Sequence, residues 1–143
     1  MTTPRARILA VEDTPHNLEL MTYLLEAHGH SVVPATTAAE ALELARAERP
    51  DLIILDVQLP DANGFDVLAT VRADEYLHDV PTVAVTANAM VGDRDHALAA
   101  GFDGYLTKPI EPTTFARSID LFLPVELRGG TSRDAAAQTP ERR

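Results

Sequence analysis

The sequence contains no cysteine, and Lys108 is the only lysine among its 143 residues. Without cysteine the chain has no disulfide bond, no thiolate metal site and no thiol chemistry. It also has no apolar run that approaches the about 18 residues of a membrane-spanning helix, so we expect no contact with a membrane. Residues 1–7 lead directly into a short apolar run and not into a signal-peptide core, which favours a cytoplasmic protein.

The composition is otherwise ordinary for a globular protein, with 45% hydrophobic and 24% charged residues. A chain of 143 residues is long enough for one domain with a substantial core. The formal net charge of -10 argues against a nucleic-acid-binding surface. Regular patterning stops after Leu123, and no repeat or second domain is visible. We therefore predict one domain over residues 1–123 and a disordered tail over residues 124–143.

Short apolar runs alternate with segments of helical periodicity along the whole patterned region. The predicted strands are residues 8–11, 31–35, 51–56, 82–86 and 105–106. The predicted helices begin at Thr14-Pro15, Thr37, Gly64-Phe65, Asp93 and Pro112. Five βα units with short links indicate an α/β fold that is doubly wound and flavodoxin-like, a (βα)5 arrangement. Its five-stranded parallel sheet would have the order 2-1-3-4-5, with five helices around it.

Polar side chains stand at the carboxyl ends of four predicted strands. Glu12 and Asp13 follow the first strand, Asp56 ends the third, Thr86 ends the fourth and Lys108 follows the fifth. In a parallel sheet these ends lie along one edge, where ligands bind. A carboxylate that ends a buried run, as Asp56 does, is costly unless it has partners. Three carboxylates, a hydroxyl and an amine together predict a divalent-cation site beside a nucleophilic carboxylate.

In this order the residues resemble the receiver domain of two-component response regulators, over about residues 6–123. The matching positions are Glu12-Asp13, Asp56, Leu59-Pro60 with Gly64, Thr86-Ala87 and Lys108-Pro109. Within the family, residues 83–93 are similar to those of single-domain regulators of the DivK type and of receivers attached to hybrid kinases. The resemblance covers most of the chain.

The resemblance implies that Asp56 accepts a phosphoryl group from a phosphohistidine, carried by a histidine kinase or a histidine phosphotransfer protein. It implies Mg²⁺ as the cofactor, held by Glu12, Asp13, Asp56 and the backbone carbonyl of Gln58. Lys108 and the Thr86 hydroxyl would contact phosphoryl oxygens. The protein would be a signalling receiver and not an enzyme, since it would catalyse only its own phosphorylation and dephosphorylation.

The resemblance also assigns switch and tuning residues. Thr86 and Tyr105 would form the switch, with Tyr105 turning inward on activation. Gln58 and Asn88 would flank the phosphoryl group and tune its hydrolysis. The sign of their effect stays open, because an amide can orient an attacking water or shield the phosphorus. Pro109 matches a proline that follows a cis peptide bond in the family.

The five histidines show no metal-ligand spacing. His16, His28 and His96 fall in predicted helices, and we expect all three on helix surfaces.

We expect a stand-alone receiver that signals by changing protein–protein interactions, as a monomer or weak homodimer. The downstream target would bind the face formed by the helix at 93–100, the strand at 105–106 and the helix from Pro112. Two alternatives within the family are a phosphotransfer intermediate and a receiver excised from a hybrid histidine kinase.

An aspartyl-phosphate hydrolase of the haloacid-dehalogenase kind is a remoter alternative. Its nucleophile lies on the first strand with a second Asp two residues later, whereas here Asp56 is on the third strand and Gln58 occupies that later place. A flavodoxin-like electron carrier lacks support because no Ser/Thr/Gly-rich phosphate loop follows the first strand.

Overall fold

The computed structural model describes residues 5–87 and 92–128. The strands are β1 (Arg7–Val11), β2 (Ser31–Ala35), β3 (Leu52–Asp56), β4 (Thr82–Thr86) and β5 (Gly104–Thr107). The helices are α1 (Pro15–Ala27), α2 (Ala38–Glu48), α3 (Gly64–Ala73), α4 (Asp93–Ala100), α5 (Phe115–Asp120) and the 3-10 helix η1 (Val125–Leu127). All five strands are parallel and follow the order β2-β1-β3-β4-β5, which confirms the predicted flavodoxin-like fold.

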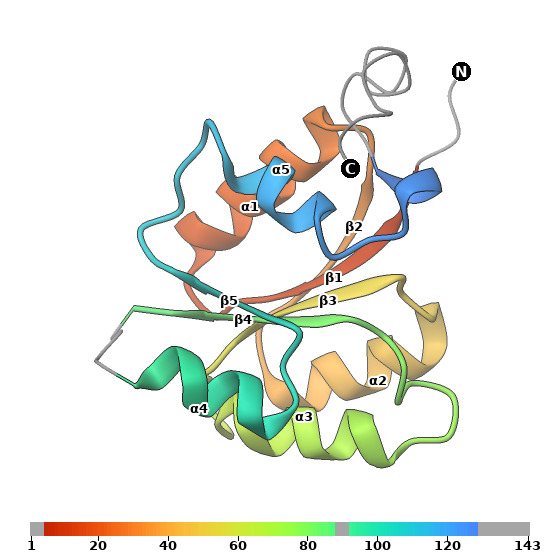
Figure 1. Cartoon of the computed structure of the whole chain (residues 1–143), viewed down its shortest axis with the longest axis vertical. Helices are drawn as coiled ribbons and strands as arrows, with labels where there is room; N and C mark the ends of the chain where they lie inside the picture. The colour runs from red at the N-terminus through yellow and green to blue at the C-terminus, as the bar shows by residue number, and fades with distance from the viewer. Residues whose placement is uncertain (1–4, 88–91, 129–143) are drawn as a thin grey trace.

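Helices cover both faces of the sheet, α1 and α5 on one face and α2, α3 and α4 on the other (Figure 1). Alternate strand residues divide between two apolar cores: Leu9 and Ile53 face the α2–α4 side, whereas Ile8 and Ile54 face the α1–α5 side. Every residue of β3 and β4 is buried. Burial on both faces explains why these strands read as continuous apolar runs in the sequence.

The register of the sheet aligns the carboxyl ends of its central strands. Val11 pairs with Leu55, Asp56 with Val85, and Thr86 with Thr107. The first polar residues beyond the apolar runs therefore meet at one edge, as the sequence predicts.

The starts of α1 to α4 agree with the sequence, and only the start of α5 differs. Thr37 caps α2, and its side chain accepts a hydrogen bond from the Glu40 N–H at 3.1 Å. Thr14 occupies the N-cap position of α1, but its side chain makes no capping hydrogen bond. The start of α1 thus lacks the side-chain hydrogen bond that a threonine favours at this position. The Thr14 N–H instead donates to Glu12 Oε2 at 3.1 Å, which ties the start of α1 to the edge of the sheet.

The fifth helix begins at Phe115 and not at Pro112, because a turn comes first. The Glu111 carbonyl accepts the N–H groups of Thr114 and Phe115, at 3.2 and 2.9 Å. Phe122 lies beyond the end of α5, and its ring packs against Gly104, where no Cβ would fit.

The segment after Leu123 begins with η1, and residues 129–143 lie outside the described residues. Within residues 5–87 and 92–128, none of the helices has both the length and the apolar character needed to cross a membrane.

Candidate functional site

Asp56 ends β3 at the carboxyl edge of the sheet and is only 3% exposed. Its Oδ1 accepts the Gln58 N–H at 2.9 Å, and its Oδ2 lies 3.1 Å from Lys108 Nζ. Burial raises the pKa of Asp56 above its ordinary value, and the charge of Glu12 adds to this, although the hydrogen bonds from Gln58 and Lys108 act in the opposite direction. Asp56 is therefore a buried carboxylate held in place on both oxygens.

Lys108 lies directly after β5, and its backbone N–H donates to the Thr86 carbonyl at 2.9 Å. Its Nζ lies 2.9 Å from Oε1 of the fully buried Glu12. Burial alone would lower the pKa of Lys108, but its hydrogen bonds to Glu12 and Asp56, and their charges, raise it. Lys108 faces two carboxylates, whereas Asp56 shares its one lysine with Glu12. The pKa of Lys108 is therefore raised, and the pKa of Asp56 is also raised because its burial outweighs the effect of the lysine.

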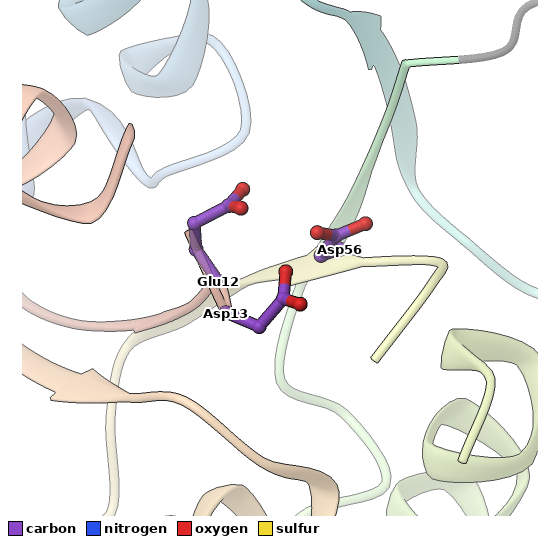
Figure 2. A group of neighbouring side chains, drawn as sticks. All are labelled: Glu12, Asp13 and Asp56. Atoms are coloured by element: carbon purple, nitrogen blue, oxygen red, sulfur yellow. The ribbon is translucent and has the colours of Figure 1, made fainter. Parts of the chain in front are cut away.

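Three carboxylates gather at this edge, from Glu12, Asp13 and Asp56 (Figure 2). One oxygen of each lies within 4.8 Å of one oxygen of the other two. Glu12 and Asp56 are buried and engaged by Lys108, whereas Asp13 is exposed. Carboxylate oxygens are the ligands that Mg²⁺ prefers, and an exposed member leaves room for the waters that Mg²⁺ keeps. The donor set thus fits a hydrated magnesium ion.

Thr86 and Tyr105 lie on neighbouring strands and line a cavity of about 180 Å³ together with Gln58 and Phe65. The Tyr105 hydroxyl is buried and has no hydrogen-bond partner in the described part of the chain. Burial, and secondarily the charge of Asp93, raises the pKa of Tyr105. The Tyr105 side chain packs against the core on the α2–α4 side, and its hydroxyl oxygen is buried there.

The loop after Asp56 approaches α3 closely at Gly64. A Cβ on Gly64 would lie 2.7 Å from Val57 Cα and 2.8 Å from the Asp56 carbonyl oxygen. The Gly64 N–H donates to the Val57 carbonyl at 2.8 Å, and Asn63 caps the helix by accepting the Asp66 N–H at 3.0 Å. Only glycine permits this approach, so Gly64 helps to fix the backbone of Asp56.

Three predicted site residues remain to be placed. Gln58 is exposed and contributes its backbone N–H to Asp56. The Lys108–Pro109 peptide bond is cis, the isomer that the resemblance implies. Asn88 lies outside the described residues.

The structure contains one cluster of titratable side chains that the sequence did not predict. His28, expected on a helix surface, instead places Nε2 at 2.8 Å from an Asp120 oxygen, and His30 does the same on the other oxygen. The expectation for His28 is wrong because α5 packs beside the end of α1. His16 and His96 are exposed, as expected. His28 and Asp120 are 92 positions apart in the chain. The sequence therefore showed that the two histidines are close to each other, but it did not show their contact with Asp120.

Comparison with known proteins finds relatives for most of the chain. The family model for the response regulator receiver domain matches residues 8–120. The polar-differentiation response regulator DivK of Brucella anthropi is 39% identical over 116 residues, which cover 81% of this chain and 94% of DivK. The structure of the chemotaxis response regulator CheY4 of Vibrio cholerae superposes with a TM-score of 0.78 at 30% identity, covering 85% of this chain and 100% of CheY4.

A further similar structure is the signal receiver domain of a signal transduction histidine kinase from Syntrophus aciditrophicus. It superposes with a TM-score of 0.74 at 29% identity and covers 82% of this chain and 89% of that domain.

Proposed function

The chain belongs to the response regulator receiver domain family, and from this premise we propose that Asp56 accepts a phosphoryl group from a phosphohistidine on a partner protein. The partner would be a histidine kinase or a histidine phosphotransfer protein. The observation that carries the proposal is the pairing of Asp56 with Lys108, at 3.1 Å, at the ligand-binding edge of the sheet.

In the proposed reaction an Asp56 carboxylate oxygen attacks the phosphorus of the phosphohistidine. An O–P bond forms as the P–N bond breaks, the imidazole leaves, and Asp56 becomes an acyl phosphate. Transfer of this kind depends mainly on positioning and on neutralising charge at the phosphoryl oxygens. Lys108 supplies a positive charge beside Asp56, and the Thr86 hydroxyl, at the end of the adjacent strand, is a donor for a second oxygen.

We propose that Glu12, Asp13 and Asp56 hold Mg²⁺, with the Gln58 backbone carbonyl as a further ligand. When bound, the ion would neutralise part of the charge on the transferred group. Without the ion, Lys108 is the cation that offsets the two buried carboxylates. Asp13 is exposed and makes the entrance to the site more acidic.

For output we propose a stand-alone receiver whose phosphorylation changes binding at the face of α4, β5 and α5. Support comes from Thr86 and Tyr105, which join the site to β4 and β5 and share one cavity. Gln58 and Asn88 would tune the lifetime of the phosphoryl group. The relative DivK is a polar-differentiation response regulator. For this chain we propose a downstream protein target, and no nucleic-acid binding because its formal net charge is -10.

A second candidate is a receiver that passes its phosphoryl group on to another histidine protein, or that works within a hybrid kinase. The similarity to the receiver domain of a histidine kinase favours it. Transfer of label from phosphorylated Asp56 to an isolated histidine phosphotransfer domain would distinguish this role from that of a terminal receiver.

The acceptor assignment is tested with phosphoramidate, a small donor whose P–N bond resembles that of phosphohistidine. With Mg²⁺, the wild-type protein should gain one hydroxylamine-sensitive phosphoryl group, measured by intact-protein mass spectrometry. Asp56→Asn should gain none, whereas Asp79→Asn, at an exposed carboxylate outside the site, should behave like the wild type. Equal labelling of Asp56→Asn and the wild type would reject Asp56 as the acceptor.

A further inference from the structure

A second polar cluster lies at the edge of the sheet opposite to Asp56. His28 is the C-cap residue of α1, and His30 immediately precedes β2. Asp120 is the last residue of α5. The cluster therefore joins three elements on the α1–α5 side, far along the strands from the proposed phosphorylation site, and the proposed function does not use it.

Each oxygen of the Asp120 carboxylate contacts one histidine. His28 Nε2 lies 2.8 Å from Oδ2, and His30 Nε2 lies 2.8 Å from Oδ1. The His30 side chain is fully buried, while the side chains of Asp120 and His28 are 10% and 21% exposed. An ionised carboxylate only accepts hydrogen bonds, so each histidine must donate through Nε2–H.

The two histidines differ in the surroundings of Nδ1, the atom that would take up a second proton. His30 Nδ1 is buried and has no partner among the described residues, so protonating it would bury an N–H group without an acceptor. The side chain of His28 reaches solvent, which can receive the second N–H. The centroids of the two rings are 5.9 Å apart, so their positive charges would repel each other if both rings were protonated. The geometry admits one imidazolium, on His28.

We propose that His28, His30 and Asp120 form a proton-sensitive latch that holds the end of α5 against α1 and β2. With His28 neutral, the cluster carries one buried negative charge. When His28 takes up a proton, its hydrogen bond to the ionised Asp120 becomes an ion pair, because both partners then carry a charge. The contact of α5 with α1 and β2 is then at its most stable.

The charge of Asp120 supports this assignment. Burial alone would raise the pKa of Asp120, but the hydrogen bond from His30 and the charge and hydrogen bond of His28 lower it below the ordinary value. Asp120 is thus ionised throughout the range from about pH 5 to 8, in which histidines ordinarily change charge. On α5, the Arg117 guanidinium donates to the Thr113 carbonyl at 3.2 Å, and beyond η1 Arg128 donates to the Leu123 carbonyl at 3.2 Å. On α1, Glu26 is exposed.

The latch is tested by NMR titration of the full chain from pH 5 to 8, with the histidine rings and the α5 amides observed together. In the wild type, the amides at the end of α5 should shift along the same curve as the His28 ring. His28→Gln keeps a donor for Asp120 but cannot take up the proton, so the α5 transition should be lost. His16→Gln, at an exposed position on α1, should leave it unchanged.

Urea unfolding gives a second readout. The wild-type midpoint should fall by about 0.5 M between pH 6 and pH 8, whereas the midpoint of His28→Gln should change by less than half as much. Labelling of Asp56 by phosphoramidate should be equal in both proteins, which separates this inference from the proposed function. Absence of the α5 transition in the wild type, or its persistence at full size in His28→Gln, would overturn the latch.

Discussion

The ammonium nitrogen of Lys108 lies 3.1 Å from Asp56 Oδ2, although the two residues are 52 positions apart in the chain. The same nitrogen lies 2.9 Å from Glu12 Oε1, so one cation offsets two buried carboxylates. Lys108 offsets part of the cost of burying both carboxylates, and Asp13 adds further negative charge nearby. This arrangement makes Lys108 important for stability as well as for the proposed chemistry.

Replacing Lys108 with methionine should lower the free energy of unfolding at pH 7 by about 2 kcal/mol, because Glu12 and Asp56 would face each other without a cation. Urea unfolding monitored by circular dichroism measures this. Lys108→Arg, which keeps the charge, should lose less than half as much. Phosphoramidate labelling should slow by at least about tenfold in the methionine variant. Equal unfolding midpoints for Lys108→Met and Lys108→Arg would show that charge is not the cause.

Asp56→Asn should be more stable than the wild type at pH 7. Folding raises the pKa of Asp56, so the unfolded chain releases this proton at lower pH than the folded protein does. Stability consequently falls as pH rises from the ordinary range of aspartate, around pH 4, through the raised value. Asparagine removes this loss, and its advantage should shrink when urea unfolding is repeated near pH 4. A larger advantage near pH 4 than at pH 7 would contradict the sign of the shift.

Magnesium binding should depend on Asp13. Asp13→Ala removes the exposed oxygen donor and should weaken Mg²⁺ binding by about tenfold or more, equivalent to about 1.4 kcal/mol, in titration calorimetry. Glu19→Ala, at an exposed carboxylate on α1, should bind like the wild type. Wild-type affinity in Asp13→Ala would exclude this residue from the metal site.

The sheet and the candidate site were predictable because buried strands appear in the sequence as apolar runs, and because the alternation of strands and helices indicates the topology. β3 and β4 are buried on both faces, so they appear as apolar runs, and the single polar residue at each carboxyl end stands out. A parallel sheet of five strands in the common order then brings Asp56 and Thr86 to one edge.

Other features depend on tertiary contacts that no local pattern records. The start of α5 depends on the bonds that the Glu111 carbonyl accepts, and Pro112 is compatible with a turn or a helix. The double pairing of Lys108 was not foreseen, because the side-chain length of Glu12 allows it to reach either an ion or the lysine. The contacts of Asp120 with His28 and His30 arise only once α5 packs on α1.

Gly64→Ala should damage the site through the backbone. The added Cβ would lie 2.7 Å from Val57 Cα and 2.8 Å from the Asp56 carbonyl oxygen, so the loop or α3 must shift. We expect a loss of about 1–3 kcal/mol in the free energy of unfolding, together with slower phosphoramidate labelling. Gly92→Ala tests an alternative cause: its Cβ would meet no atom within 4 Å, and its cost would come from a φ of +91° alone. Gly92→Ala should therefore lose stability without slowing the labelling.

The last prediction concerns the route from Asp56 to the α4–β5–α5 face. Beryllofluoride, a mimic of the phosphoryl group, should draw the Thr86 hydroxyl towards Asp56, since a hydrogen bond to a charged group contributes about 1.5–3 kcal/mol. Thr86 and Tyr105 share a cavity of about 180 Å³, and the buried Tyr105 hydroxyl lacks a partner among the described residues. We therefore expect Tyr105 to move into the space that Thr86 leaves.

Amide NMR shifts on adding beryllofluoride should consequently extend from Asp56 through α4 to Tyr105 and α5. Thr86→Ala should still bind beryllofluoride, because Asp56 and Lys108 remain, but the shifts in β5 and α5 should be reduced by at least half. Thr70→Ala, at an exposed threonine on α3, is the matched control and should respond like the wild type. Distal shifts of full size in Thr86→Ala would mean that the signal reaches β5 by another path, even with Asp56 as the acceptor.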